Sequence, residues 1–484
     1  MIHRFLERHF QLAANGTHPR QEAVAGLSTF LTMSYIIFVQ PAVLSGAMFG
    51  FDSGMDIGAI TTATCLSAAI ATLLMGLWAR YPIALAPGMG ANFFFILTVV
   101  PAASAAGFGA GWQTALGVIF IAGLLFLLIT LSGLRAALMQ AVSPALKNGI
   151  AVGIGLFIAF VGLRNAGLIL NDPATAVALN TSFASPDLIV FFFGLLLTAG
   201  LHARRVTGAI LWGIAATTLL AVMLHFALPA LWAPGASGAE TPAVIKESQL
   251  MTRFAPEGLA GGPLSLPPSL GPTLMAMDLA GAITVKMLPF IIIFLFIDVF
   301  DTMGTLVAVS EQGGFVKDNR LVRGNQAFLS DAVGTLAGAA MGTSTVTAYI
   351  ESITGIIQGG RTGLTAVVTA ACFLLALFFS PLVAVVGSYS PITAPALVIV
   401  GSMMLQNIKR IDLDEYSEAI PAFIIILGIP LSYSIADGIA LGFMAYPVVK
   451  LIAGRGRDVS PIMYGLAVLL ALYFLFLRGP GGGA

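Results

Sequence analysis

The sequence predicts an all-α polytopic membrane protein with fourteen spans, arranged as two inverted repeats of seven spans each. Three observations support this fold class. Of the 484 residues, 58% are hydrophobic and only 9% are charged, whereas a soluble domain carries about 25% charged residues. Apolar runs of bilayer length recur along the chain. Basic residues gather in the loops that this span count places in the cytoplasm.

The first half of the chain contains seven apolar runs. A polar, basic segment, residues 1–22, precedes them and is predicted to be cytoplasmic. The first run is too long for a signal-peptide core and lacks a clear cleavage site, so it is interpreted as a span. The runs cover residues 23–45, 57–79, 83–100, 112–133, 146–164, 187–201 and 206–232, and residues 23–232 form the predicted first repeat.

A Pro/Gly-rich segment, residues 233–285, follows and is predicted to lie outside the cytoplasm. Seven further runs form the predicted second repeat, residues 286–453. They cover residues 286–310, 327–341, 345–358, 363–386, 391–407, 418–433 and 435–453. The C-terminal segment, residues 454–484, holds one more apolar run at residues 462–477. The sequence does not decide whether that run is an extra span or an interfacial helix.

The distribution of basic residues agrees with a cytoplasmic N-terminus. The predicted outer loops carry few cations, chiefly Arg164 and those of the segment 233–285. The predicted inner loops carry Arg80, Arg135, Lys147, Arg204, Arg205, Lys317, Arg320, Arg323, Arg361, Lys409, Arg410, Lys450, Arg455 and Arg457. Because seven is an odd number, the second repeat enters the membrane from the opposite side, which is the inverted arrangement common in secondary transporters.

The third run of each half is interrupted in a way that a continuous helix does not tolerate. In the first half it reads YPIALAPGMGANFFFIL, with prolines and glycines in its middle. In the second half residues 342–357 read GTSTVTAYIESITGII, rich in Thr and bounded by glycines. Interrupted spans at matching positions of two repeats predict a binding site near the membrane midplane.

Three acids lie inside the predicted spans. In residues 290–309, Asp298, Asp301, Thr302 and Thr305 are spaced i, i+3, i+4 and i+7, so on a helix they form one polar stripe. Glu351 is the third acid and lies in the interrupted tenth span. A carboxylate in hydrocarbon costs roughly 2.5–3.5 kcal/mol on insertion scales. The acids therefore predict a ligand or ion site rather than lipid contact.

Several motifs together resemble one family. FLTMSYIIFVQP, LAPGMGAN, FIDVFDTMGTL, GTSTVTAYIES and GGRTGLTAVV occur in that order along the chain and together resemble the adenine/guanine/hypoxanthine permease (AzgA-like) branch of the nucleobase–cation symporter-2 family. The chain departs from the family pattern at Gln40 and Ala91. The resemblance implies a core domain of spans 1–4 and 8–11, a gate domain of spans 5–7 and 12–14, and short antiparallel strands in broken spans 3 and 10.

The resemblance also implies a function and a site. The function would be import of adenine, guanine or hypoxanthine across the cell membrane by cation symport, with H⁺ favoured over Na⁺, through alternating access. Substrate would contact Glu351, Asp301, Asn92 and Phe93, next to Ala91 and Thr305, while Asp301, Asp298 and Glu351 would couple the cation. The residues expected to support this site are Asp331, Thr343, Ser344, Thr345 and Tyr35.

The chemistry of the acids agrees with a purine ligand. A carboxylate such as that of Glu351 can accept two N–H bonds side by side and so fix a purine ring in its plane. Aromatic side chains such as Phe93, Phe94 or Tyr35 could stack on the ring, although Phe side chains in spans more often pack against lipid or protein.

The sequence also bears on other classes of function. The same fold could carry uracil, xanthine or an anion, but three acids without an intramembrane Arg or Lys disfavour an anion site. A channel would need a continuous polar pore stripe. Asp298 and Asp301 form D-x-x-D, half of a magnesium-diphosphate motif, yet no second such motif lies on another span. We therefore expect no enzyme activity, catalytic residue, metal, cofactor or nucleic-acid partner, while the sequence leaves a homodimer open.

Overall fold

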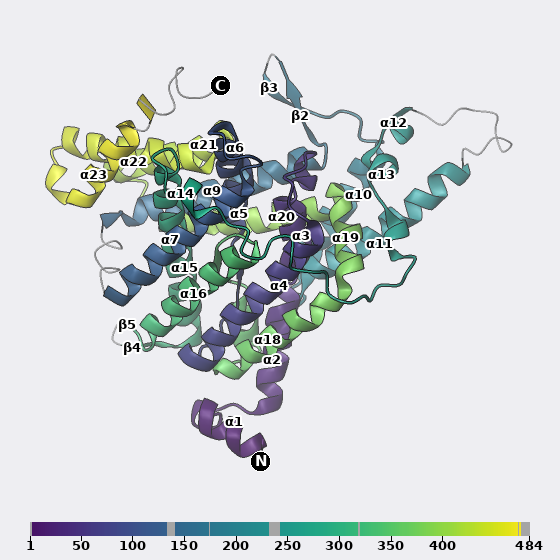
Figure 1. The fold of residues 1–484 in the computed structure, drawn as a ribbon, viewed down its shortest axis with the longest axis horizontal. Helices are drawn as coiled ribbons and strands as arrows, with labels where there is room; N and C mark the ends of the chain where they lie inside the picture. Colours follow the sequence, from purple (N-terminus) through teal and green to yellow (C-terminus); the bar gives the residue numbers. More distant parts are fainter. Residues whose placement is uncertain are drawn as a thin grey trace.

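The computed structural model describes residues 2–132, 141–173, 175–231, 243–317, 320–472 and 474–475. Arg135, the start of the predicted outer segment and the end of the run 462–477 lie outside these residues. Figure 1 shows a mostly helical molecule in which purple and blue helices of the first half lie beside green helices of the second.

The predicted runs coincide with helices or helix pairs. In the first half these are α2 (Pro19–Met33) with α3 (Ile36–Leu44), α4 (Ile57–Leu74), α7 (Trp112–Ser132), α9 (Pro144–Asn165), α10 (Pro186–Ala203) and α11 (Ala209–Leu231). In the second half they are α15 (Leu288–Gly313), α16 (Gly324–Met341), α18 (Gly363–Ala376) with α19 (Ser380–Ser388), α20 (Ser390–Met404), α21 (Tyr416–Ser432) and α22 (Ile435–Ile452).

The third and tenth spans are broken, as the prolines and glycines predict. The third consists of β1 (Leu85–Pro87), α5 (Met89–Phe94) and α6 (Val100–Ala105), the two helices being joined by a wide helical turn. The tenth consists of β6 (Val346–Ala348) and α17 (Ser352–Ile357). Ahead of β6, α16 ends at Gly342, whose φ of 99° is a left-handed conformation that favours glycine.

Within the described residues, ten helices are long and apolar enough to cross a membrane. The helix α21 and the broken third span are shorter, and α16 is less apolar. The described part of the extra C-terminal run forms α23 (Pro461–Leu472), of 12 residues. Residues 474–475 are also helical, and the run continues into residues that the structure does not describe.

Helix packing forms two groups. In the first, termed the core group, α16 packs against α4 and α7, and α18 packs against α2 and α4. In the second, termed the gate group, α9 packs against α20 and α21, while α10 packs against α11 and α20. The core group holds spans 1–4 and 8–11 and the gate group the others, as the family resemblance implied.

A buried acid fastens two spans of the core group. Glu22, in α2, has no exposed surface. Its carboxylate accepts hydrogen bonds from the backbone N–H groups of Arg361, Thr362 and Thr365 at 2.9–3.3 Å and from the Thr365 hydroxyl at 2.6 Å. These N–H groups belong to the start of α18, where an anion also interacts favourably with the helix dipole.

Short elements occupy the loops. The loop between α9 and α10 is a hairpin of β2 (Ile169–Asp172) and β3 (Ala176–Leu179), and the loop between α15 and α16 contains β4 (Val316–Lys317) and β5 (Arg320–Leu321). The long segment before α15 contains α12 (Ala243–Lys246), α13 (Gln249–Thr252) and α14 (Leu279–Ala282), and α1 (Ile2–Phe10) precedes α2.

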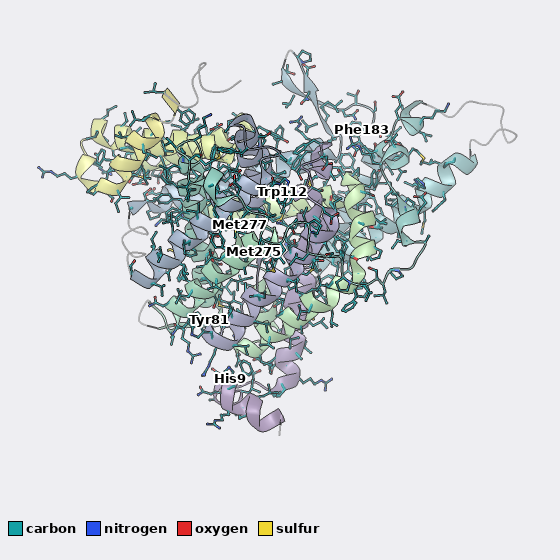
Figure 2. All side chains as sticks on the ribbon, in the orientation of Figure 1. His9, Tyr81, Trp112, Phe183, Met275 and Met277 are labelled. Atoms are coloured by element: carbon teal, nitrogen blue, oxygen red, sulfur yellow. The ribbon has the colours of Figure 1, made fainter. Side chains whose placement is uncertain are left out.

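The long segment before α15, which is predicted to lie outside the cytoplasm, contacts both groups. Asp187, at the start of α10, accepts hydrogen bonds from Gln249 N at 2.8 Å, Leu250 N at 3.0 Å and the Tyr389 hydroxyl at 2.7 Å. Further along, Met275 N donates to Ala340 O of α16 at 2.6 Å. Met275 and Met277 are labelled in Figure 2, where this part of the segment crosses the middle of the molecule. The segment is therefore anchored to a gate helix at one end and a core helix at the other.

Candidate functional site

The two broken spans meet through their strands. β1 and β6 pair antiparallel, with Leu85 opposite Ala348 and Pro87 opposite Val346. Two further backbone bonds extend the pair, from Gly88 N to Thr345 O at 2.9 Å and from Tyr349 N to Ala84 O at 3.0 Å. Backbone N–H and C=O groups that would bond within a helix are thus bonded to the other repeat. Irregular backbone is tolerated at membrane depth when its polar groups have such partners in the protein.

Glu351 lies where the tenth span passes from strand to helix, directly before α17. Its side chain is 9% exposed, and its Oε1 accepts a hydrogen bond of 2.9 Å from the hydroxyl of Tyr35, which lies between α2 and α3. Tyr349, two residues earlier, donates its hydroxyl to Pro87 O at 2.5 Å. A tyrosine from span 1 thus orients the carboxylate, while a second tyrosine fixes the strand pair beside it.

Asp301, on α15, lies next to the same strand pair, beside Gly88. The structure places its Oδ2 3.7 Å from the position that a Cβ on Gly88 would occupy. Its side chain is partly exposed, and among the described residues none donates a hydrogen bond to its carboxylate. Asp301 and Glu351 are close enough to interact electrostatically. The site therefore combines one acid held by a tyrosine with one acid whose carboxylate accepts no hydrogen bond from the described residues.

Asp298 and Asp331 are buried, and threonine hydroxyls connect each of them to strand β6. Asp298 Oδ2 accepts a hydrogen bond of 3.2 Å from the hydroxyl of Thr335, which also bonds both backbone groups of Val346 in β6. Asp331 Oδ2 accepts one of 2.8 Å from Thr302, whose hydroxyl also lies 2.9 Å from that of Thr347. Within the described residues, Oδ1 of each acid is buried without a hydrogen-bond partner.

A second polar network is built around Gln40. Gln40, in α3, donates its amide N–H₂ to the hydroxyls of Thr343 and Ser344 at 2.9 and 3.1 Å. Its Oε1 accepts a hydrogen bond from Asn92 Nδ2, and the Ser344 hydroxyl donates to Asn92 Oδ1. All of these side chains are buried. The network links span 1 to both broken spans.

Phe93 is enclosed by other aromatic rings. Its ring meets those of Phe49 and Phe157 edge to face, with centroids 5.9 and 6.0 Å apart. Phe94 packs instead against Phe294 of α15 at 4.7 Å. In this conformation Phe93 contributes to the packing between the core group and α9 of the gate group.

The structure therefore sorts the predicted site residues into three places. Glu351, Tyr35 and Asp301 lie around the strand pair. Asp298 and Asp331 are connected to β6 through threonine hydroxyls. Asn92, Thr343 and Ser344 belong to the amide and hydroxyl network. Thr345 joins the strands through its backbone, Ala91 is buried in α5, and Thr305 is half-buried on α15. Substrate contact and coupling by any of these residues stay predictions.

Sequence reasoning missed several polar residues around the site, namely Gln40, Tyr349, Thr302, Thr335 and Thr347. Thr302 was present in the polar stripe of α15, so its spacing could have indicated a role. The roles of the others depend on contacts between distant parts of the chain, such as the pairing of Gln40 with residues 303 and 304 positions away.

The fold and this site define a multi-pass membrane transporter built of two inverted seven-span repeats. Solved structures share that fold: the transmembrane domain of the cyanobacterial bicarbonate transporter BicA superposes with a TM-score of 0.55 at 16% identity, covering 86% of this chain and 97% of that one. The murine anion transporter Slc26a9 gives a TM-score of 0.56 at 12% identity, covering 90% and 68%. These likenesses confirm the predicted fold class.

The chain belongs to the permease family of nucleobase–cation symporters, whose family model matches residues 20–441. It is 46% identical to a putative permease of Methanocaldococcus jannaschii over 99% of this chain and all of that one. It is 41% identical to the guanine/hypoxanthine permease PbuG of Bacillus subtilis over 98% and 100%, and 37% identical to the adenine permease AdeQ of Escherichia coli over 98% and 96%. The predicted family, and a transporter rather than an enzyme, are confirmed.

Proposed function

We propose that this permease imports purine nucleobases by cation symport, with the substrate bound between the core and gate groups. The observation that carries the proposal is the convergence of Glu351 and Asp301 on the strand pair of the two broken spans. The names of the relatives, among them guanine/hypoxanthine and adenine permeases, support purines as the substrate class.

Glu351 is the proposed anchor for the purine ring. The Tyr35 hydroxyl holds one of its oxygens, so the carboxylate is oriented before substrate arrives. A purine offers neighbouring N–H donors, which a carboxylate oxygen accepts in charge-assisted bonds. A ligand that left Glu351 unpaired in this site would be disfavoured, because a buried acceptor without a donor is costly.

Asp301 is the proposed coupling group. Its carboxylate accepts no hydrogen bond from the described residues and lies near Glu351, so it can take up a proton on one side of the membrane and release it on the other. Neutralising this charge would lower the cost of carrying the loaded core group through the apolar barrier during alternating access. Asp298 and Asp331, bonded to threonine hydroxyls, are proposed to hold α15 and α16 against β6 around it.

The Gln40 network gives Asn92 a positioning role in this proposal. The Asn92 amide is fully engaged with Gln40 and Ser344, so it keeps the start of α5 in register with the tenth span. Substrate contact at this place would then use the backbone N–H groups at the start of the half-helices, where the helix dipole favours electron-rich ligand atoms.

The test is uptake into proteoliposomes of radiolabelled adenine, guanine, hypoxanthine and uracil, with and without an inward proton gradient. We expect accumulation of at least one purine that depends on the proton gradient, with uracil ignored. Accumulation of uracil alone would replace the purine assignment by the alternative solute. Accumulation that follows a sodium gradient and ignores protons would replace the coupling ion.

A further inference from the structure

A pocket of about 230 Å³ lies at the outer end of the seam between the two groups. Its lining includes Phe49 from the core group, Arg164, Asn165 and Tyr433 from the gate group, and Gln249 and Arg253 from the long outer segment. The pocket lies on the face predicted to be extracytoplasmic, where the sequence places few cations. Two arginines at this one place therefore need an explanation.

A chain of aromatic rings connects the pocket to the broken third span. Two of its lining rings, Phe49 and Tyr433, are the ends of an edge-to-face chain that runs through Phe93 and Phe157. Successive centroids in this chain are 5.9, 6.0 and 5.2 Å apart. The pocket is thus connected to the broken third span, which contains Phe93, through aromatic rings of both groups.

The two arginines differ in the contacts that their guanidinium groups already make. Arg164 donates to Asn171 Oδ1 at 2.8 Å and lies over the Tyr433 ring at 5.1 Å. Arg253 is exposed, and among the described residues its guanidinium has neither a hydrogen bond nor an ion pair. Gly50, with a φ of 78°, brings its backbone close to that guanidinium, since a Cβ there would lie 3.2 Å from Nη2. The guanidinium N–H groups of Arg253, a residue that lines the pocket, therefore have no partner among the described residues.

Two amide atoms on the pocket wall are also unused. Gln249 Oε1 and Asn165 Nδ2 are buried and have no hydrogen-bond partner within the described chain. Their residues are nevertheless fixed, because Gln249 N is bonded to Asp187 and Gln249 Nε2 donates to Asn165 O at 3.3 Å. Buried polar atoms without partners are rare in folded proteins, so an enclosed acceptor and donor in two residues that line the pocket beside Arg253 point to a polar ligand that these side chains turn toward when it binds.

We propose that this pocket is an outer capture site for 6-oxopurines, an inference that rests on the proposed purine transport. The O6 and N7 atoms of such a ring are adjacent acceptors, which one arginine binds in a bidentate manner. The ring N–H beside O6 is a donor, which the Gln249 amide oxygen accepts once its side chain turns toward the pocket. Adenine carries an amino donor where O6 would be, so it cannot form the same pair with Arg253.

The test compares Arg253→Gln with Lys246→Gln, which removes an exposed cation from the same segment without touching the pocket. Uptake of hypoxanthine and adenine is measured in right-side-out and inside-out vesicles. We expect Arg253→Gln to raise the KM for hypoxanthine about tenfold in right-side-out vesicles. The maximal rate, the adenine KM and the KM in inside-out vesicles should match those of Lys246→Gln.

Each other outcome decides against a specific claim. A hypoxanthine KM of Arg253→Gln equal to that of Lys246→Gln would overturn the capture site and leave the proposed function intact. An equal rise for adenine would overturn the oxopurine specificity, and an equal rise in both vesicle orientations would place the effect away from the outer face. Absence of purine uptake by the unaltered protein would overturn the proposed function and the capture site together.

Discussion

The Tyr35 hydroxyl donates a hydrogen bond of 2.9 Å to Oε1 of Glu351, although the two residues are 316 positions apart. This bond joins the middle of span 1 to the point where span 10 changes from strand to helix. It uses one carboxylate oxygen and restricts the directions in which the other can point. We therefore expect Tyr35 to act on substrate affinity through the orientation of Glu351.

Tyr35→Phe should raise the KM for purine uptake roughly tenfold, because it removes a hydrogen bond to a charged group. The maximal rate should change much less, since the carboxylate itself remains. Tyr464→Phe is the matched control, because that hydroxyl bonds Gly456 O far from the site. Equal KM values for the two variants would argue against an orienting role of Tyr35.

Glu351→Gln should lower purine uptake about 100-fold or more, because the amide offers only one acceptor oxygen and loses the charge. The variant should still reach the membrane in normal amount, which quantitative immunoblotting of membrane fractions would establish. Normal uptake by Glu351→Gln would remove this residue from the proposed site.

Asp301→Asn should lose concentrative uptake while it retains exchange. An amide cannot take up and release a proton, but it preserves the size of the side chain beside Gly88. The measurement pairs accumulation under an inward proton gradient with exchange of labelled for unlabelled purine at equal concentrations. Unchanged accumulation would show that coupling depends on another group.

Gly88→Ala should reduce the rate of uptake about tenfold, since misplacement of the site by an ångström or less is enough for such a loss. A Cβ at this position would lie 2.9 Å from Thr347 Cγ2, so the Thr347 side chain or β6 itself must shift. Gly304→Ala on α15 is the control, because a Cβ there meets nothing within 4 Å. Similar rates for the two variants would contradict the tight packing at Gly88.

Glu22→Ala should destabilise the protein by about 2–4 kcal/mol, because it leaves the N–H groups at the start of α18 without their buried acceptor. Thermal unfolding in detergent would show a lower Tm. Asp414→Ala, in an exposed loop, should change the stability by less than about 0.5 kcal/mol. A KM for purine equal to that of the unaltered protein would separate this role from the binding site.

Much of the fold could be predicted from hydrophobicity and from proline and glycine, because these properties act locally. Runs of apolar residues gave the spans to within a few positions, and Pro87 with Gly88 marked the break in span 3. The short run 462–477 was ambiguous in sequence because length alone separates a span from a surface helix.

The site was predictable in its acids and less so in their partners. Asp298, Asp301 and Glu351 were conspicuous because charge is rare in apolar runs. The bonds from Thr335 to Asp298, from Tyr35 to Glu351 and within the Gln40 network depend on which spans pack together. Serine, threonine and glutamine are common in membrane helices and commonly bond their own backbone, so sequence alone does not single them out.

The pairing of β1 with β6 also has a consequence for synthesis on the ribosome. The partner of β1 is encoded about 260 residues later, and at 5–20 residues per second it emerges roughly 13–50 s after β1 does. Until then the backbone groups of Leu85 and Ala86 cannot complete this pairing in the bilayer. The first repeat therefore enters the membrane unfinished, and its third span must be sheltered by the insertion machinery or by neighbouring spans until the second repeat arrives.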